Sequence, residues 1–474
     1  VSMDAILNRS VVEFRRCVID MHTPGIKRLE GLVRFGRDDF YGSQRAPTQQ
    51  PRCRIIAQIE THQCVSNIDL ALVCQRAQHG AMTMTPGSSS RGVLDGIVVA
   101  DFSRVLAGPY ATMLLADMGA TVIKVESPTG DDTRAWQPPV RDDQATYFLS
   151  VNRNKHAIAL DLKNDDDLAT AHKLLAKADV FIENWKPGGL KKFGMDPAAV
   201  AQRYPHLVHA SITGFGTKGG AHLPGYDLLA QAASGLMDIT GEPDAAGQKA
   251  GVAIFDVVTG LHATVGILGA LHERQHSGQG QHIAVNLMSS ALSGLVNQTS
   301  AYVAGGVVPK RMGNDHPSLA PYGPFAAADQ SLIIAVGNDG QFRRLAKALG
   351  APELADDERY ATNPARNAHR EQLRTELEAR LQHKTASVWV DQLRQVQIPC
   401  SEVFTIAQGV QFAQDIGLEP VQPAGAEQVP TVKHPIEYSR SQVTYDKAPP
   451  QLNEDADAIL AWLNTETQSI SGLG

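Results

Sequence analysis

The 474-residue sequence is short of the features that mark several large classes of protein. Its formal net charge is -7, so it lacks the excess of basic residues with which nucleic-acid binders contact phosphates, and we expect no nucleic-acid partner. It has no uninterrupted apolar run of about 18 residues, so we expect no membrane span. Of its five cysteines only Cys400 lies beyond residue 92, which argues against a disulfide scaffold and favours a reducing, cytoplasmic location.

Several catalytic signatures are missing as well. The turn after the first predicted strand, residues 103–108 (SRVLAG), has neither the GxGxxG pattern of dinucleotide-binding proteins nor the P-loop pattern. A GxSxG nucleophile elbow and an HExxH helix are absent, so neither an α/β-hydrolase nor a zinc protease is indicated. Cys53, His62, Cys64 and Cys74 fit no common zinc spacing. We therefore expect no metal site.

Regular structure is predicted from Leu94 onward. Residues 96–103 (GIVVADFS) are typical of a buried strand, residues 109–118 of a helix that begins with proline, and residues 121–126 of the next strand. This βαβ unit implies a parallel sheet. The alternation continues, with further strands expected at 156–162, 179–183, 207–213 and 281–286, and further helices at 165–177, 197–203, 227–237 and 256–276. The pattern predicts a doubly wound, Rossmann-like α/β domain.

The domain organisation follows from where this pattern stops. The large α/β domain is expected to comprise residues 93–290 and 420–474, and residues 325–405 are expected to form a smaller α+β domain. Residues 291–324 and 406–419 are predicted to be linkers between them. Residues 1–92 show no sustained period and are predicted to be a leader that is disordered or stems from an upstream start site, with a regulatory extension as the alternative.

One carboxylate stands in an unusual position. Asp227 follows the glycine-rich stretch 214–225 and begins a predicted helix. The N–H groups and dipole at a helix N-terminus favour an ionised carboxylate there, and an ionised carboxylate can attack an acyl carbonyl to form an anhydride. The same position is more commonly filled by a helix N-cap. The residues alone leave both roles open for Asp227.

Longer stretches of the chain resemble a known family. The matching stretches are ADFSRVLAGPYATMLLADMGATVIKVE, GDDTRAW, YFLSVNRNKHAIALDLK, VFIENWKPGGLKKFGM, ASITGFG, PGYDLLAQAASGL and TGLHATVGILGALHERQHSGQGQ. They resemble the class III CoA transferases, the family of formyl-CoA transferase, in the same order from about residue 94 to about residue 440. GNDHPSLAPYGPF and AVGNDGQFRRLAKALG are most similar to the branch of succinyl-CoA:dicarboxylate transferases.

The resemblance implies a set of functional residues. It places the nucleophile on Asp227, whose role as a helix N-cap then becomes an additional one. The CoA-binding residues that it implies are Val105, Leu106, Leu160, Asp161, Leu162, Lys163, Asn184, Trp185, Lys186, Lys192, Thr213, Gly214, Phe215 and Gly216. Lys163 and Lys192 suit the phosphates of CoA, although an exposed lysine needs no such role. The resemblance also places Tyr147 near the acyl group, with a core aromatic as the alternative.

Two departures bear on the substrate. Ser127 stands where formyl-CoA transferase has an arginine, and residues 312–316 (MGNDH) replace its glycine-run loop. Both argue against oxalate and formyl-CoA. His316 is a candidate contact for the acyl group or the acceptor carboxylate, although a loop histidine is more often merely exposed.

The activity implied by the resemblance needs no permanently bound cofactor, because CoA enters as a substrate. An acyl-CoA, with succinyl-CoA as our choice of donor, would pass CoA to a small carboxylic or dicarboxylic acid through an aspartyl anhydride and an aspartyl-CoA thioester. The family also implies an interlocked-ring homodimer. Two alternatives remain: an acyl-CoA epimerase of the same fold, which Tyr226 disfavours because that branch carries histidine there, and a non-catalytic CoA-binding protein.

Overall fold

The structure is a computed structural model that describes residues 92–465. The predicted leader, apart from Gly92, lies outside these residues, and so does the group of Cys53, His62, Cys64 and Cys74. The boundary predicted between the leader and the large domain falls at the edge of the described chain and stays a prediction.

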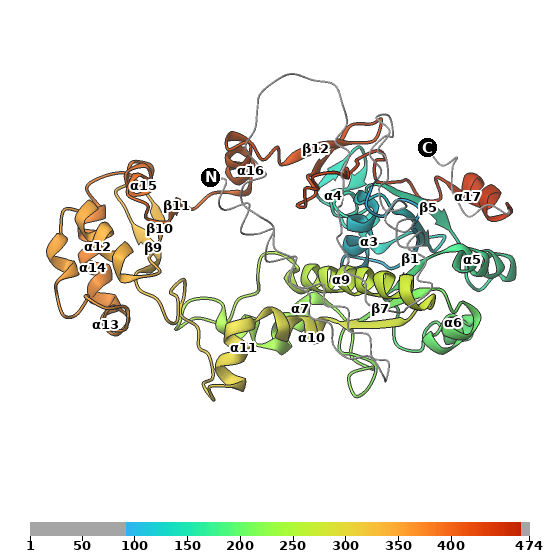
Figure 1. Cartoon of the computed structure of the whole chain (residues 1–474), viewed down its shortest axis with the longest axis horizontal. Helices are drawn as coiled ribbons and strands as arrows, with labels where there is room; N and C mark the ends of the chain where they lie inside the picture. The colour runs from blue at the N-terminus through green and yellow to red at the C-terminus, as the bar shows by residue number, and fades with distance from the viewer. Residues whose placement is uncertain (1–91, 466–474) are drawn as a thin grey trace, which may run out of the picture. The chain divides into compact units, whose positions relative to one another are not determined.

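A six-stranded parallel sheet forms the centre of the larger part of the described chain (Figure 1). Its strand order is β5-β2-β1-β6-β7-β8, and every neighbouring pair runs parallel. The bounds are β1 Val98–Phe102, β2 Thr121–Glu126, β5 Lys155–Ala159, β6 Val180–Glu183, β7 Val208–Thr213 and β8 His282–Asn286. The expectation of a mixed α/β fold with a parallel central sheet is confirmed.

Helices cover both faces of this sheet. Their bounds are α3 Ala107–Asp117, α5 Asp165–Lys177, α6 Pro197–Arg203, α9 Ile254–Ser277 and α17 Ala456–Leu463. Side chains of β1 alternate between the two faces: Val98 and Phe102 join a core with α5, α6 and α17, and Val99 joins a core with α3 and α9. The C-terminal α17 lies beside α5, almost three hundred residues earlier in the sequence (Figure 1).

Helix α9 is long and apolar enough to cross a membrane by length and composition, with a mean hydropathy of 1.7 over an 18-residue window. No such segment was expected from the sequence. In the described part of the chain 44% of that window is buried, and α9 contributes side chains to the core that it shares with α3. Small residues allow the burial, since a Cβ on Gly260 would lie 2.6 Å from the carbonyl oxygen of Ala107 in α3. The glycine at this position therefore allows close backbone contact between α3 and α9.

Short elements connect the sheet to its surroundings. They are the 3₁₀ helices Asp132–Ala135 and Lys191–Phe193, the hairpin β3 Val140–Arg141 and β4 Gln144–Ala145, and the helices α4 Thr146–Leu149, α7 Asp227–Ser234, α8 Leu236–Ile239, α10 Leu287–Gly294 and α11 Val296–Val303. The predicted helix 227–237 is thus two helices, because Gly235 adopts a φ of 91° between them. The segment predicted as a linker at 291–324 contains the end of α10 and the whole of α11.

A second, smaller arrangement has its own hydrophobic core. Its antiparallel sheet has the order β11-β10-β9, with β9 Tyr322–Ala326, β10 Ser331–Ala335 and β11 Cys400–Glu402. Its helices are α12 Asp339–Ala348, the 3₁₀ helix Pro352–Ala355, α13 Asn363–Ala368, α14 Arg370–Leu381 and α15 Ala386–Gln395. Helix α16 Ile406–Asp415 and the hairpin β12 Val421–Ala424 and β13 Val429–Val432 come next along the chain. The predicted linker 406–419 is therefore largely helical, starting with a capping box at Thr405.

Candidate active site at the carboxyl edge of the sheet

The strand order places a topological switch between β1 and β6. From β1 the chain continues to β2 and β5 on one side, while β6, β7 and β8 lie on the other. In open α/β sheets the crevice outside the carboxyl ends of the strands at such a switch is the usual ligand site. Here the two loops are tied together: the Arg104 N–H donates to Asn184 Oδ1 at 3.0 Å, and Asn184 Nδ2 donates to the Arg104 carbonyl at 2.7 Å.

Four of the sequence-predicted CoA-binding segments lie at this same edge. They follow the carboxyl ends of β1, β5, β6 and β7, and they contain Val105 and Leu106, Leu160 to Lys163, Asn184 to Lys186, and Thr213 to Gly216. Leu160 and Leu162 are buried in the core under β5, so only backbone is available for a ligand there. Lys163 is exposed. Lys192 is also exposed, in the 3₁₀ helix Lys191–Phe193, with its ammonium 4.7 Å from the centre of the Phe193 ring.

Buried charges beneath the edge hold the β1 loop in place. Val105 has a φ of 70°, which is strained for a β-branched residue, and its N–H donates to the Asp131 carboxylate at 3.2 Å. Lys124, fully buried, donates to the same carboxylate at 2.9 Å and to the Ser103 carbonyl at 3.2 Å. Burial would raise the pKa of Asp131, but the Lys124 ammonium and the Thr133 N–H lower it to about 2. The β1 loop is therefore held by a hydrogen bond to the ionised Asp131 carboxylate.

Asp227 is brought to the edge by a pinched glycine loop. A Cβ on Gly214, directly after β7, would lie 2.3 Å from the Cα of Gly225, so the two ends of the loop touch. Only glycine permits this approach. Asp227, two residues beyond Gly225, is thereby held near the end of β7 and is buried, with a relative exposure of 8%.

Three N–H donors converge on the Asp227 carboxylate. Oδ1 accepts from the backbone N–H groups of Phe255 at 2.7 Å and Asp256 at 3.2 Å, and Oδ2 accepts from Gln231 Nε2. Phe255 and Asp256 are the second and third residues of α9, whose own N-cap, Ala253, has no side-chain hydrogen-bond acceptor. These are the N–H groups that an N-cap side chain usually satisfies. The prediction that Asp227 caps its own helix is therefore wrong: Tyr226 is the N-cap of α7, and Asp227 caps α9 instead.

Two further side chains complete the neighbourhood. Asp256 is largely buried, and this burial, together with the charge of Asp227, raises its pKa to about 7. Burial and the charges of Asp256 and Asp227 raise the pKa of Tyr147, on α4, to about 12. Tyr147 also shares a small apolar cluster with Leu106 and with Ala253. The β1 loop, Tyr147 and the residue that precedes α9 thus pack in one cluster.

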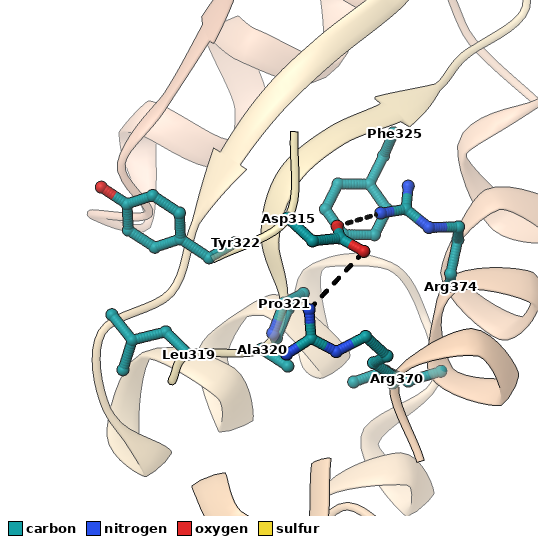
Figure 2. Close-up of a pocket in the computed structure, with 9 residues that line it drawn as sticks. Asp315, Leu319, Ala320, Pro321, Tyr322, Phe325, Arg370 and Arg374 are labelled. Atoms are coloured by element: carbon teal, nitrogen blue, oxygen red, sulfur yellow. Dashed lines mark hydrogen bonds and ion pairs between the residues drawn. The ribbon is translucent and has the colours of Figure 1, made fainter. Parts of the chain in front are cut away.

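His316 has neighbours of a different kind. Its ring lies 5.0 Å from that of Tyr322 on β9, its Nδ1 accepts from the Ser318 N–H, and its carbonyl accepts from Arg370 on α14. The adjacent Asp315 is bound by Arg370 and Arg374, as Figure 2 shows. These contacts of His316 all lie in the smaller α+β part, and none of them connects it with Asp227.

Gln231 and Asp256 were not among the residues predicted from the sequence. Gln231 follows Asp227 by four residues on one helix, and this spacing places both side chains on the same face. The i to i+4 spacing could therefore have identified Gln231 as a neighbour of Asp227. Asp256 meets Asp227 only through tertiary contact, and the sequence offers no local signal for it. Among residues 92–465 no cluster of three His, Cys, Asp or Glu side chains is arranged to hold a metal ion.

Comparison with known proteins gives one consistent result. A family model described as CoA-transferase family III matches residues 94–456. A succinate–glutarate CoA-transferase of Agrobacterium fabrum is 41% identical over 81% of this chain and 98% of its own length. A succinyl-CoA:glutarate CoA-transferase of Mus musculus is 39% identical over 77% of this chain and 85% of its own length. A crystal structure of a CaiB/BaiF family protein from Brucella suis, 41% identical, superimposes with a TM-score of 0.72 over 79% of this chain and 100% of that chain.

Proposed function

This chain belongs to CoA-transferase family III and is a CoA-transferase, and on that premise we propose that it moves CoA from succinyl-CoA to a small carboxylic or dicarboxylic acid through Asp227. The observation that carries the proposal is the buried Asp227 carboxylate with three N–H donors at the carboxyl edge of the sheet. Charge-assisted hydrogen bonds of this kind hold a carboxylate in one orientation, which is what a nucleophile needs.

The proposed first half-reaction has two steps. Oδ2 of Asp227 attacks the thioester carbonyl, the C–S bond breaks, and CoA leaves as a thiolate from an acyl-aspartyl anhydride. The thiolate then attacks the Asp227 carbonyl carbon, the donor acid leaves as its carboxylate, and an aspartyl-CoA thioester remains. Covalent exchange retains the energy of the thioester, so no nucleotide is consumed.

The second half-reaction reverses the sequence with the acceptor. The acceptor carboxylate attacks the aspartyl thioester to form a new anhydride and release the thiolate, which attacks the acceptor acyl carbon and frees Asp227. Every attack on the Asp227 carbonyl places negative charge on Oδ1. The N–H groups of Phe255 and Asp256 already point at Oδ1, so they would act as an oxyanion hole.

The CoA site in this proposal is the set of loops at the switch point. The loops at Val105, Asn184 and Gly214 to Gly216 would line the CoA site with their backbone, and the exposed ammonium groups of Lys163 and Lys192 would meet the phosphates. Tyr147 would lie beside the acyl group, because it is close enough to Asp227 and Asp256 for their charges to raise its pKa. The succinate and glutarate in the names of the two relatives support a dicarboxylate acceptor, and glutarate is our first choice.

We also propose that the working form is an interlocked homodimer. An apolar surface on α11 and the residues after it supports this: Tyr302 and Val303 are 60% and 76% exposed, and Val307 and Val308 are exposed as well. Contiguous exposed apolar side chains of this kind usually mark an interface. Sedimentation or light scattering would give the mass, and a monomer at micromolar concentration would contradict the dimer.

The test of function is direct. The protein is incubated with succinyl-CoA and, in turn, glutarate, 3-hydroxy-3-methylglutarate and oxalate, and new acyl-CoA products are identified by mass spectrometry. We expect glutaryl-CoA from the wild type and none from Asp227→Asn. Asp238→Asn, at an exposed carboxylate on the neighbouring α8, is the matched control and should stay active. Epimerised acyl-CoA without CoA exchange would replace our proposal with the epimerase alternative.

Trapping identifies the nucleophile. Hydroxylamine attacks both the anhydride and the aspartyl thioester, so it should convert Asp227 to a hydroxamate only while acyl-CoA is present. The modified peptide should contain Pro224 to Asp227. Acyl-CoA-dependent modification of another carboxylate would show that the role had been assigned to the wrong residue.

A further inference from the structure

Two carboxyl groups meet at the start of α9 in very different surroundings. Asp227 accepts three hydrogen bonds, from Gln231 and from the N–H groups of Phe255 and Asp256. Within residues 92–465, no group donates to the Asp256 carboxylate and no lysine or arginine pairs with it. The backbone of Asp256 supports Asp227, while its own side chain is left without support.

This lack of support favours the protonated form of Asp256. Burial first, and then repulsion from Asp227, raises the pKa of Asp256 to about 7. Tyr147, the other titratable group beside the pair, has its pKa raised to about 12 and stays neutral. A carboxylic acid that stays protonated beside a reacting group commonly serves as a general acid.

We propose that Asp256 is a second catalytic residue, which gives its proton to the CoA thiolate as Asp227 becomes acylated and takes it back when the thiol attacks. The inference rests on the proposed transfer through Asp227 and adds a residue to it. The position is suitable because the backbone N–H of Asp256 donates to Asp227 Oδ1, with 3.2 Å between nitrogen and oxygen, and because the Asp256 carboxylate is close enough to interact with both Asp227 and Tyr147.

The proton balance closes over each half-reaction. Attack by the Asp227 carboxylate expels a thiolate, and transfer of the Asp256 proton gives CoA thiol and an Asp256 carboxylate. Acylation removes the negative charge of Asp227, so the repulsion that held the proton on Asp256 disappears at that moment. When the thiol attacks, its proton returns to Asp256 and the departing carboxylate restores the original charge. An alkyl thiol with an ordinary pKa of about 8.5 is a suitable partner for this exchange.

Three variants test the proposal with kcat/KM for succinyl-CoA measured from pH 5.5 to 9. Asp256→Asn keeps the shape and the hydrogen-bonding capacity but cannot transfer a proton. Asp256→Glu keeps the proton at a shifted position. Glu273→Gln removes an exposed charge from the same helix and serves as the control. Unfolding curves and CoA binding report whether each variant folds.

We expect the wild-type profile to fall on the alkaline side around pH 7, because the acid form of Asp256 is required. Asp256→Asn should lose about 10²- to 10⁴-fold in kcat near pH 6, with KM changed far less, and should lose this alkaline limb. Asp256→Glu should recover part of the rate and show the limb at a different pH. Glu273→Gln should match the wild type.

The outcomes separate this inference from the proposed function. If the wild type transfers CoA and Asp227→Asn does not, the function stands. A kcat and an alkaline limb unchanged in Asp256→Asn would then overturn the role of Asp256 alone, and so would a loss confined to KM. If Asp256→Asn fails to fold, a wild-type profile that stays flat between pH 6 and 8.5 would reject the role. Absence of transfer in the wild type would instead reject the function.

Discussion

Replacing Asp256 by asparagine should make the fold more stable, by an amount that grows with pH. Burial and the charge of Asp227 raise the pKa of Asp256 from 3.8 to about 7 in the folded protein. Between these two values the folded protein keeps a proton that the unfolded chain has lost. Raising the pH through this window therefore favours the unfolded chain, and the full penalty is present above about pH 7. Asparagine carries no charge, so the Asp256→Asn variant does not lose this stability as the pH rises.

The size of the effect follows from the shift. A difference from 3.8 to about 7 corresponds to about 4 kcal/mol as an upper bound. The side chain keeps some contact with water, so we expect a gain of about 2–4 kcal/mol in the free energy of unfolding at pH 8. The gain should shrink to about 1 kcal/mol at pH 4.5, where Asp256 is protonated in the folded protein and the pH is only slightly above the pKa of 3.8 in the unfolded chain.

Urea unfolding of the wild type and Asp256→Asn at pH 4.5 and pH 8 measures this gap. Any effect of the amide itself is the same at both pH values, so the change in the gap is the quantity that matters. Introducing Asp227→Asn into both proteins should reduce the gap at pH 8, because one of the two causes of the shift is then absent. A gap that does not change with pH would refute the reasoning, and so would a wild type that is the more stable protein at pH 8.

Three further predictions concern neighbouring residues. Asp227→Asn should lower CoA transfer by several orders of magnitude while the free energy of unfolding falls by only about 1 kcal/mol, because the amide oxygen still accepts the α9 N–H groups; a transfer rate within tenfold of wild type contradicts it. Gln231→Leu removes one donor to Asp227 and should lower kcat about tenfold, with succinyl-CoA KM as the internal control. Asp131→Asn leaves Lys124 buried without its partner and should cost about 3–5 kcal/mol at pH 7. Since the folded pKa of Asp131 is depressed to about 2, this stabilisation should disappear as the pH falls from about 4 to 2, which acid unfolding curves of both proteins would reveal.

Local signals explain which elements were predictable. Helices α5 and α6 begin and end where the sequence indicates, because Asn164 and Asp196 cap them and Pro197 starts the second. The strand β2 is marked by its β-branched residues. Helices α11 and α16 have no buried residues, so no packing against a core marks them, and linkers were predicted in their place.

Some features of the candidate site could likewise be predicted from the sequence, and others depend on tertiary contacts. The position of Asp227 after a glycine-rich loop was visible in the sequence. The segments proposed for CoA binding were implied by the family resemblance, and their placement after predicted strands followed from the strand pattern. That Asp227 caps α9 and not its own helix depends on Gly214 meeting Gly225 and on where α9 begins, and these are tertiary facts. Asp256 is drawn into the site by the same contact, twenty-nine residues away along the chain.

The two main-chain donors to Asp227 have a consequence for how such an enzyme can change over evolutionary time. A side-chain donor can be lost through one codon change, but the N–H groups of Phe255 and Asp256 persist through any substitution other than proline. If acyl exchange proceeds through Asp227 as proposed, these two donors would be insulated from most mutations, while the loops that would meet the acceptor acid would remain free to vary. New acceptor preferences would then arise by drift around a centre that stays intact, and related enzymes named for different acids are the expected result.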